Sequence, residues 1–270
     1  MKRNIFFSAL VLFFLLFSAT CSRRAVRGEP KNTDELNDRV LGILVSPVVV
    51  RPSSIRDTLG FLPSEVRSFP TSNELVTALK TRRVDGMLTT TETSKFLISA
   101  DDTLGILPDS MIQHQGLAMI LRKTDEKLVE ELNMAITRLR AEGMLEKLYE
   151  DYIADVTVRK LAETPAQIPE IPGAETILVG INGDLPPYDY ISADGKPAGF
   201  NVALMGEISQ ILGKNVTFVT IPSETRYSAL LSSSSRRMDL FFWFYGQLEI
   251  DRLVLTDVYA HVEECILTRK

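Results

Sequence analysis

A single loop of this sequence carries two side chains suited to holding a small molecule. Asp184 and Tyr188 lie on either side of the pair Pro186-Pro187. The prolines restrict the backbone of the loop and could present the tyrosine ring for stacking or a cation–π contact, while Asp184 could accept a hydrogen bond from a ligand hydroxyl or amine. Each residue also has a structural alternative: Tyr188 could only pack the loop, and Asp184 could only stabilise its turn.

Five consecutive aromatic residues, Phe241 to Tyr245, form the densest aromatic cluster of the chain. Their simplest interpretation is a central strand whose alternating faces fill a core. In the alternative interpretation Trp243 or Tyr245, at the end of that strand, enters a ligand cleft. There it would contact an aromatic or apolar solute, or simply fill the cleft.

Patterns typical of catalysis or of metal binding are absent from the sequence. It contains no Gly-x-Ser-x-Gly, no glycine-rich phosphate loop and no His/Cys spacing typical of a metal site. Its two histidines, His114 and His261, are far apart in the chain. These observations favour a binding protein over an enzyme, with no cofactor and no metal.

The N-terminus has the layout of a secretory signal. Lys2 and Arg3 precede an apolar run from Ile5 to Phe17, which is short for a membrane span, and small residues then lead to Cys21. The stretch resembles a bacterial lipoprotein signal, in which residues 1–20 are removed and Cys21 is lipidated. We therefore expect a lipid-anchored protein of the bacterial cell envelope, in or facing the periplasm. An ordinary signal peptide or an uncleaved anchor is the alternative.

Charge and cysteine content argue against nucleic acid as a partner and against a disulfide within the chain. The formal net charge is −5 and no basic stripe is present, which argues against nucleic-acid binding. Once Cys21 carries a lipid, Cys265 is the only other cysteine, so no disulfide can form within the chain. Cys265 lies in an apolar segment and is expected to be a buried small hydrophobe.

The helices and strands that position these residues lie before and after one linker. Residues 160–175 contain three prolines and no apolar periodicity, which is typical of an extended spacer. Before and after this linker, short apolar runs that predict buried strands alternate with helical patterns. Such alternation predicts an α/β fold with mainly parallel sheets, and the chain is long enough for two domains. The expected elements include a helix at 72–81, strands at 40–45, 84–88, 176–181, 216–221 and 238–244, and a hairpin at 188–200.

The resemblance to a known family is carried by six segments: Ile177–Tyr188, Asp194–Lys196, Gly199–Asn201, Met238–Leu240, Thr256–Tyr259 and Ile266–Lys270. Through them residues 177–270 resemble the first lobe of bacterial extracellular solute-binding proteins of family 3, which serve polar amino-acid ABC transporters. The last segment resembles a strand that crosses between the lobes of that family. The second lobe of that family resembles upstream segments, at Glu35–Leu44, Phe69–Leu79 and Arg83–Gly86. A return crossing at Gly116–Lys123 and closing helices at Leu128–Tyr152 follow them.

The two lobes therefore stand in reversed order, and the resemblance implies a two-lobed periplasmic-binding-protein type II fold that is circularly permuted. The new termini would fall at one hinge crossing and leave only one continuous crossing. A permuted monomer, a domain-swapped dimer and a tandem pair that has lost its outer halves remain open. The expected divisions are a signal peptide at 1–20, the second lobe at 35–115, the return crossing and closing helices, which pack on the first lobe, at 116–155, the linker at 160–175 and the first lobe at 176–270.

The resemblance also implies a ligand cleft between the lobes, and several of its anchors differ here. The arginine that holds a ligand carboxylate falls at Arg252 or, counted from the other side, at Glu249. The anion-binding turn is replaced by Ser46–Pro52, which lacks the glycine that would let backbone amides surround a carboxylate. The aspartate that pairs with a ligand amine is Thr90, with Glu92 nearby. These departures argue against an ordinary zwitterionic amino acid.

The sequence thus predicts a lipid-anchored solute-binding protein that captures a small polar or amino-acid-like solute between two lobes for the permease of an ABC importer. The alternative is a degenerate binding-protein fold that acts as an envelope sensor or scaffold without transport. The candidate ligand contacts are Asp184, Tyr188, Trp243, Tyr245, Arg252, Thr90 and Glu92.

Overall fold

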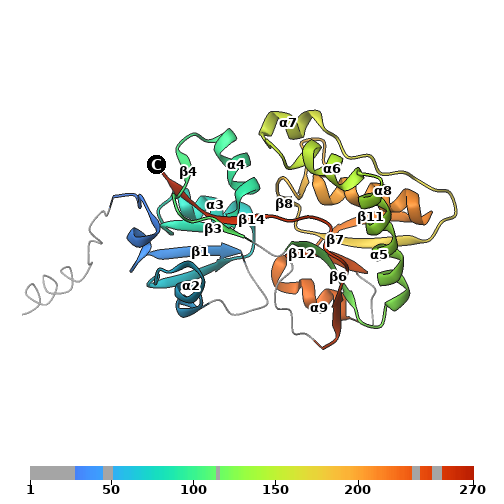
Figure 1. The fold of residues 1–270 in the computed structure, drawn as a ribbon, viewed down its shortest axis with the longest axis horizontal. Coiled ribbons are helices and arrows are strands. Elements are labelled where there is room, and N and C mark those ends of the chain that lie inside the picture. The colour runs from blue at the N-terminus through green and yellow to red at the C-terminus, as the bar shows by residue number, and fades with distance from the viewer. Residues whose placement is uncertain (1–27, 45–50, 114–115, 233–237, 245–250) are drawn as a thin grey trace, which may run out of the picture.

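The computed structural model describes residues 28–44, 51–113, 116–232, 238–244 and 251–270, and these form two α/β lobes, each built on its own main sheet (Figure 1). The two-lobed α/β fold predicted from the sequence is thereby confirmed. We keep the names used above: the second lobe is the one that contains residues 28–113, and the first lobe is the one that contains residues 176–255. No helix within the described ranges is long and apolar enough to span a bilayer.

The second lobe has a sheet with strand order β2-β1-β3-β14-β4, and β5 pairs with β14. Strand β1 is parallel to β2 and β3, whereas β14 is antiparallel to β3 and β4. Successive residues of a strand face opposite sides, so Val40 packs in one apolar cluster with Leu75 while Leu41 packs in another with Phe61. The elements are η1 (Thr33–Leu36), β1 (Val40–Leu44), α2 (Pro52–Leu59), β2 (Glu65–Phe69), α3 (Ser72–Lys80), β3 (Gly86–Thr90), α4 (Thr91–Ala100), β4 (Leu104–Ile106), β5 (Ile112–Gln113) and β14 (Glu263–Arg269).

The first lobe has a sheet with strand order β11-β7-β12-β6-β13, and a small sheet β10-β9-β8 beside it. Strands β11, β7 and β12 are parallel, and β6 is antiparallel to β12 and β13. The helices are α5 (Glu126–Ala141), α6 (Met144–Tyr152), α7 (Val158–Glu163), α8 (Phe200–Leu212), η2 (Ser223–Thr225) and α9 (Arg226–Leu231). The strands are β6 (Leu117–Arg122), β7 (Thr176–Ile181), β8 (Asp184–Leu185), β9 (Asp189–Ile191), β10 (Pro197–Ala198), β11 (Asn215–Thr220), β12 (Leu240–Phe244) and β13 (Leu253–Leu255).

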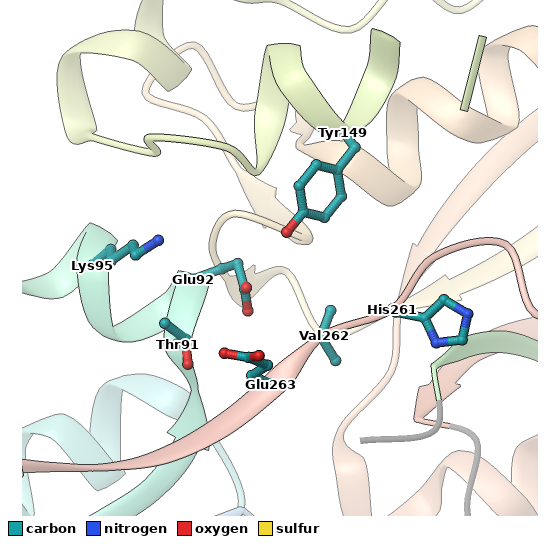
Figure 2. Close-up of a pocket in the computed structure, with 7 residues that line it drawn as sticks. All are labelled: Thr91, Glu92, Lys95, Tyr149, His261, Val262 and Glu263. Atoms are coloured by element: carbon teal, nitrogen blue, oxygen red, sulfur yellow. The ribbon is translucent and has the colours of Figure 1, made fainter. Parts of the chain in front are cut away.

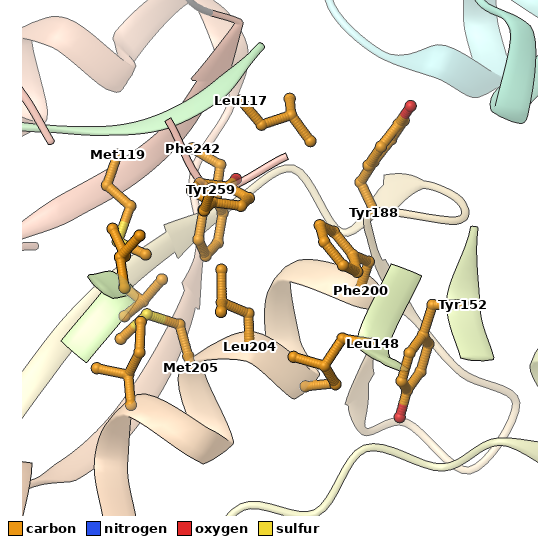
Figure 3. Packing of buried hydrophobic residues seen from close by; sticks show 14 of the residues in the cluster. Leu117, Met119, Leu148, Tyr152, Tyr188, Phe200, Leu204, Met205, Phe242 and Tyr259 are labelled. Atoms are coloured by element: carbon orange, nitrogen blue, oxygen red, sulfur yellow. The ribbon is translucent and has the colours of Figure 1, made fainter. Parts of the chain in front are cut away.

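The largest core belongs to the first lobe and is closed by helices from both sides of the linker. Helices α5 and α6, which precede the linker, contact α8, which follows it. Rings of Phe200, Phe242 and Tyr259 meet in this core, and Figure 3 shows the Tyr188 hydroxyl pointing out of it, toward the second lobe. Leu44 and Phe96 of the second lobe also pack against the cluster, so the two lobes share apolar surface.

The chain crosses between the lobes twice, and this corrects two expectations. It passes from β5 to β6, and from β13 to β14 through residues 256–262. Each of these connections joins one lobe to the other, so the prediction of a single continuous crossing was wrong. The first lobe was also expected to extend to residue 270, but β14 pairs with β3 and β4 and therefore belongs to the second lobe.

Equivalent aspartates stabilise the start of the first strand in each lobe. The Asp85 carboxylate accepts a hydrogen bond from the Val40 amide at the start of β1, at 2.9 Å. The Asp239 carboxylate accepts one from the Leu178 amide of β7, also at 2.9 Å. Asp239 is 1% exposed and pairs with Arg122 at the end of β6, 3.2 Å away. The Val84-Asp85-Gly86 and Met238-Asp239-Leu240 segments thus serve the same structural purpose in the two lobes.

The linker packs against the first lobe. The segment expected as a spacer at 160–175 begins inside α7 and then runs across α8, where a Cβ added at Gly206 would clash with the Gln167 carbonyl. The side chain of Asn215 accepts a hydrogen bond from the Ile171 amide and donates one to the Ile171 carbonyl, at 2.8 and 2.9 Å. Gly206 and Asn215 therefore hold the linker against the first lobe.

Candidate functional site

The N-terminus of α4 meets the loop that follows β8, and here the two lobes contact each other directly. Thr90 caps α4, with its hydroxyl accepting from the Thr93 amide at 3.2 Å. The Thr93 hydroxyl in turn donates to the Pro186 carbonyl of the first lobe, at 3.0 Å. Thr90 stands where the family has an amine-binding aspartate, and in this chain its side chain starts a helix.

Tyr188 and Glu92 form the most buried polar contact between the lobes. The Tyr188 hydroxyl donates to Glu92 Oε2 at 2.9 Å, and the tyrosine is only 1% exposed. Burial, together with the neighbouring Glu92 charge, raises the pKa of Tyr188 well above its usual range, so the hydroxyl keeps its proton. In this conformation Tyr188 closes the cleft instead of presenting its ring to a solute.

Asp184 makes a second direct bridge of the same kind. Its carboxylate accepts a hydrogen bond from the Asn73 amide at the N-terminus of α3, at 3.1 Å. Burial raises the pKa of Asp184, and the hydrogen bonds from the backbone amides of Ser72 and Asn73 oppose this. A carboxylate at the N-terminus of a helix is also stabilised by the helix dipole.

A pocket of about 460 Å³ lies beside these contacts, at the junction of both lobes and one crossing (Figure 2). Helix α4 of the second lobe, helix α6 on the first lobe and the segment that leads into β14 all contribute to its wall. In Figure 2 the carboxylates of Glu92 and Glu263 and the hydroxyl of Tyr149 point into the same space, whereas His261 lies beyond Val262. The pocket is lined by Thr91, Glu92, Lys95, Tyr149, His261, Val262 and Glu263.

The electrostatics of the pocket are dominated by its two carboxylates. Burial raises the pKa of Glu92, and the charge of Glu263 adds to that effect, against the lowering influence of hydrogen bonds and of Lys95. Burial also raises the pKa of Tyr149, with further contributions from the charges of Glu92 and Glu263. Negative charge therefore prevails near the Tyr149 hydroxyl.

The other predicted ligand contacts do not meet at this pocket. Arg252 is exposed in the turn before β13, where its carbonyl accepts from the Lys123 amide at 2.9 Å. Trp243 lies in β12 opposite Ala118, and its side chain is outside the described part of the chain. Tyr245, Glu249 and most of the replaced anion turn at 46–52 also lie outside the described residues. Within the described ranges, no group of three or more His, Cys, Asp or Glu side chains could hold a metal ion.

Sequence reasoning found Glu92 but missed Tyr149 and the residues of the crossing. Tyr149 follows the apolar spacing of α6, so it gives the same signal as a core residue. Glu263 stands at the first position of a strand, where a charged residue is common. The sequence signal that could have indicated Glu263 was the pair Glu263-Glu264 beside an apolar run. Adjacent residues of a strand face opposite sides, so one of the two charges at a predicted crossing must face the space between the lobes.

Comparison with known proteins gives one family match. The family of bacterial extracellular solute-binding proteins, family 3, matches residues 177–242, and this confirms over that segment the resemblance seen in the sequence. The matched family is one of binding proteins, and the match supports a ligand-binding role in the periplasm or cell envelope. No curated protein matches the sequence.

Several solved structures are similar to this chain at low sequence identity. One is the ligand-binding component of an ABC-type import system from Staphylococcus aureus with zinc bound, at 12% identity and a TM-score of 0.47, covering 86% of this chain and 66% of that one. Another is the alkanesulfonate-binding protein SsuA from Xanthomonas axonopodis pv. citri bound to MOPS, at 12% identity and 0.42, covering 90% and 67%. A prephenate dehydratase from Arthrobacter aurescens in complex with L-Phe matches at 10% and 0.37, covering 86% and 60%. The chain thus spans just under two thirds of the first of these proteins.

Proposed function

We propose that this chain, whose residues 177–242 match extracellular solute-binding proteins of family 3, captures a small polar solute between its two lobes and delivers it to the permease of an ABC importer. The observation that carries the proposal is the pocket at the junction of α4, α6 and the crossing into β14. Each lobe and one crossing contribute to its wall, so a bound solute would contact every part that moves when the lobes open.

The connections between the lobes suit such a motion. Two crossings join the lobes in the part of the chain that the structure describes, and direct polar contacts such as Tyr188–Glu92 and Asp184–Asn73 can break without disturbing either sheet. Hinge closure around a ligand needs a few residues between rigid bodies. Residues 256–262 meet that description, because they carry no helix or named strand between β13 and β14.

The proposed setting is the cell envelope, with Cys21 as the lipidated first residue of the mature protein. The proposed assembly is a monomer, because both lobes are completed within one chain; a domain-swapped dimer is the alternative. Light scattering during size-exclusion chromatography separates the two, and metabolic labelling with a fatty-acid analogue tests Cys21 against a Cys21→Ser control.

A thermal-shift screen tests the solute-binding function. A solute present at 100 times its dissociation constant should stabilise the folded protein by about 2.7 kcal/mol, which is a shift of a few degrees for a protein of this size. The screen should cover amino acids, amines, carboxylates and aromatic solutes, with calorimetry on each hit. If no compound shifts the melting temperature, solute binding between the lobes is the wrong function.

A sensor or scaffold that works without transport is the second candidate, and the closed cleft favours it. Tyr188, which would face a solute in an open cleft, is buried against Glu92. Spin labels at Arg56 on α2 and Lys147 on α6, both exposed, would report the distance between the lobes. A transport protein should show two distance populations that a solute shifts, whereas a scaffold should show one distance that no solute changes.

A further inference from the structure

We propose that the pocket between the lobes takes an organic cation, with an ammonium or guanidinium group held between Glu92 and Glu263 and its carbon chain against Tyr149. This inference names the ligand class of the site described above and so rests on the proposed function. It commits to an amine without a carboxylate, in contrast to the amino-acid-like solute that the sequence resemblance implies.

Within the described residues, neither carboxylate of the pocket has a cationic partner. Glu92 is 6% exposed and its Oε2 accepts from Tyr188, whereas Glu263 is exposed, and neither forms an ion pair with another described residue. Lys95 is exposed at the margin of the pocket in Figure 2, apart from both carboxylates. A buried carboxylate is normally paired or neutralised. A cationic ligand would supply the missing partner.

A second polar group at the wall is also unsatisfied. Thr91 lines the pocket and is 6% exposed, and its hydroxyl has no hydrogen-bond partner by geometry. The thiol of Cys265 is close enough to bond that hydroxyl, but a thiol is only a weak acceptor and donor. Buried polar groups in native proteins usually find partners, so an unsatisfied hydroxyl at a pocket wall points to a group that is bound there. An ammonium donor would satisfy it.

The size and lining of the pocket favour an organic cation over a bare metal ion. About 460 Å³ is far more space than an ion needs, and it lies within the range of small-molecule sites. The described residues offer no set of three metal ligands. The ring of Tyr149 and the side chain of Val262 supply apolar wall, and an aromatic face attracts an alkylammonium group.

The same charges disfavour a ligand that carries its own carboxylate. Such a group would meet the field of Glu92 and Glu263, and Lys95 is the only lysine or arginine among the residues that line the pocket. Arg252, the predicted carboxylate anchor, is exposed in the turn before β13 and does not line the pocket. A decarboxylated amine should therefore bind more tightly than the amino acid with the same side chain.

Calorimetry with matched pairs tests the inference on the purified chain: agmatine against arginine, and cadaverine against lysine, with glutarate as the anion control. We expect each amine to bind at least about tenfold more tightly than its amino acid, and glutarate not to bind. Glu263→Gln should weaken amine binding at least about tenfold. Glu146→Gln, on the exposed face of α6, makes the same charge change away from the pocket and should leave affinity unchanged.

Glu92→Gln should weaken amine binding as Glu263→Gln does, and a melting curve of each variant shows that the fold is retained. Equal loss of affinity in Glu146→Gln would indicate attraction to net charge alone and overturn the inference. If arginine or glutarate binds in place of the amines, the ligand class is wrong while the binding function stands. If no solute of any class binds, the proposed function fails as well.

Discussion

The hydrogen bond from Tyr188 to Glu92 joins a ring of the first-lobe core to a helix of the second lobe. Both partners are buried, with exposures of 1% and 6%. A buried acceptor that loses its donor keeps its desolvation cost, so this single bond contributes more to closure than an exposed one would. Residues that were predicted to contact a solute thus contact each other.

Tyr188→Phe should separate the hydrogen bond from the packing of the ring. Phenylalanine keeps the ring inside the cluster but leaves Glu92 without its donor, so we expect a loss of about 1–3 kcal/mol in the free energy of unfolding measured with urea. Tyr190→Phe is the matched control, because Tyr190 is half-buried in β9 beside the same loop. Equal losses in both variants would mean that the Glu92 contact adds nothing.

Glu92→Gln should remove the pH-dependent loss of folding stability that comes from a buried, charged carboxylate. Because burial raises the pKa of Glu92, the folded protein holds that proton more tightly than the unfolded chain does. Stability from this group is therefore fully present below the unfolded pKa, about 4.3, and is lost as the pH rises through the raised folded value. Glutamine still accepts from Tyr188 and carries no charge, so the variant should melt higher than the parent near pH 7.

Melting temperatures of parent and Glu92→Gln across pH 4 to 8 check the sign. The two curves should converge at the acidic end, where the parent carboxyl is protonated. A difference that does not change with pH would contradict the assignment. The variant should be the more stable protein and the weaker binder of amines, which is the usual conflict between a functional charge and the stability of its surroundings.

At the scale of elements, β6 and β14 are the strands that tie the lobes together, since each belongs to one sheet and follows a crossing from the other lobe. Arg122 closes β6 by donating to the carbonyls of Leu230 and Met238 and pairing with Asp239. This arginine joins a strand that precedes the linker to elements that follow it, so it helps to fix the two halves of the first lobe together.

Arg122→Met should be costly for that reason. It would remove the Arg122 partner of Asp239, which is 1% exposed, and removing one partner of a buried pair costs about 3 kcal/mol or more. Arg138→Met is the control, because the Arg138–Glu142 pair is exposed on α5 and contributes well under about 1 kcal/mol. Chemical denaturation gives both values. A cost for Arg122→Met no larger than the control would show that the Arg122–Asp239 pair adds nothing to stability.

The elements themselves were largely predictable, because periodicity is a local property. The expected helix at 72–81 is α3 (Ser72–Lys80), and the expected strand at 176–181 is β7. The hairpin predicted around Asp194-Gly195 forms between β9 and β10. What the sequence could not supply was the pairing of β14 with β3, since a strand's partners depend on contacts with residues far away in the chain.

The candidate site was predictable only in part, for the same reason. Glu92 was found because it follows a recognisable strand, but other residues of the pocket come from α6 and from the crossing into β14. Thr90 was named as a candidate ligand contact, and no local pattern indicated that its side chain caps α4. The burial of Tyr188 depends on how the lobes close, which no local pattern records.

At the scale of the molecule, both ends of the described chain lie on the second lobe. Glu29 pairs with Arg269 at 2.8 Å and with Arg82 at 2.6 Å, so the two ends of the described chain lie close together. The permuted order stays a prediction, but this proximity makes it testable. The ends could be joined and the chain reopened elsewhere without moving either sheet.

A rearranged chain should fold. We would join Lys270 to Gly28 through a short glycine–serine linker and open the chain between Pro172 and Gly173, beyond the Asn215 contacts with Ile171. Loops and exposed segments tolerate new termini. The product should unfold cooperatively by circular dichroism and melt within a few degrees of the parent. Opening the same joined chain between Phe241 and Phe242, inside β12, should abolish folding; failure of the first variant would contradict the permutation.

The placement of both described ends on one lobe also decides which lobe would carry the force from a membrane anchor. If Cys21 carries a lipid, as the sequence predicts, the anchor pulls on the second lobe alone, because Glu29 and Arg269 hold that end of the chain to its sheet. A force on the anchored end is then not transmitted through the two crossings between the lobes. The first lobe could then move between open and closed positions without carrying that force. Tension from the membrane anchor would neither open nor close the pocket.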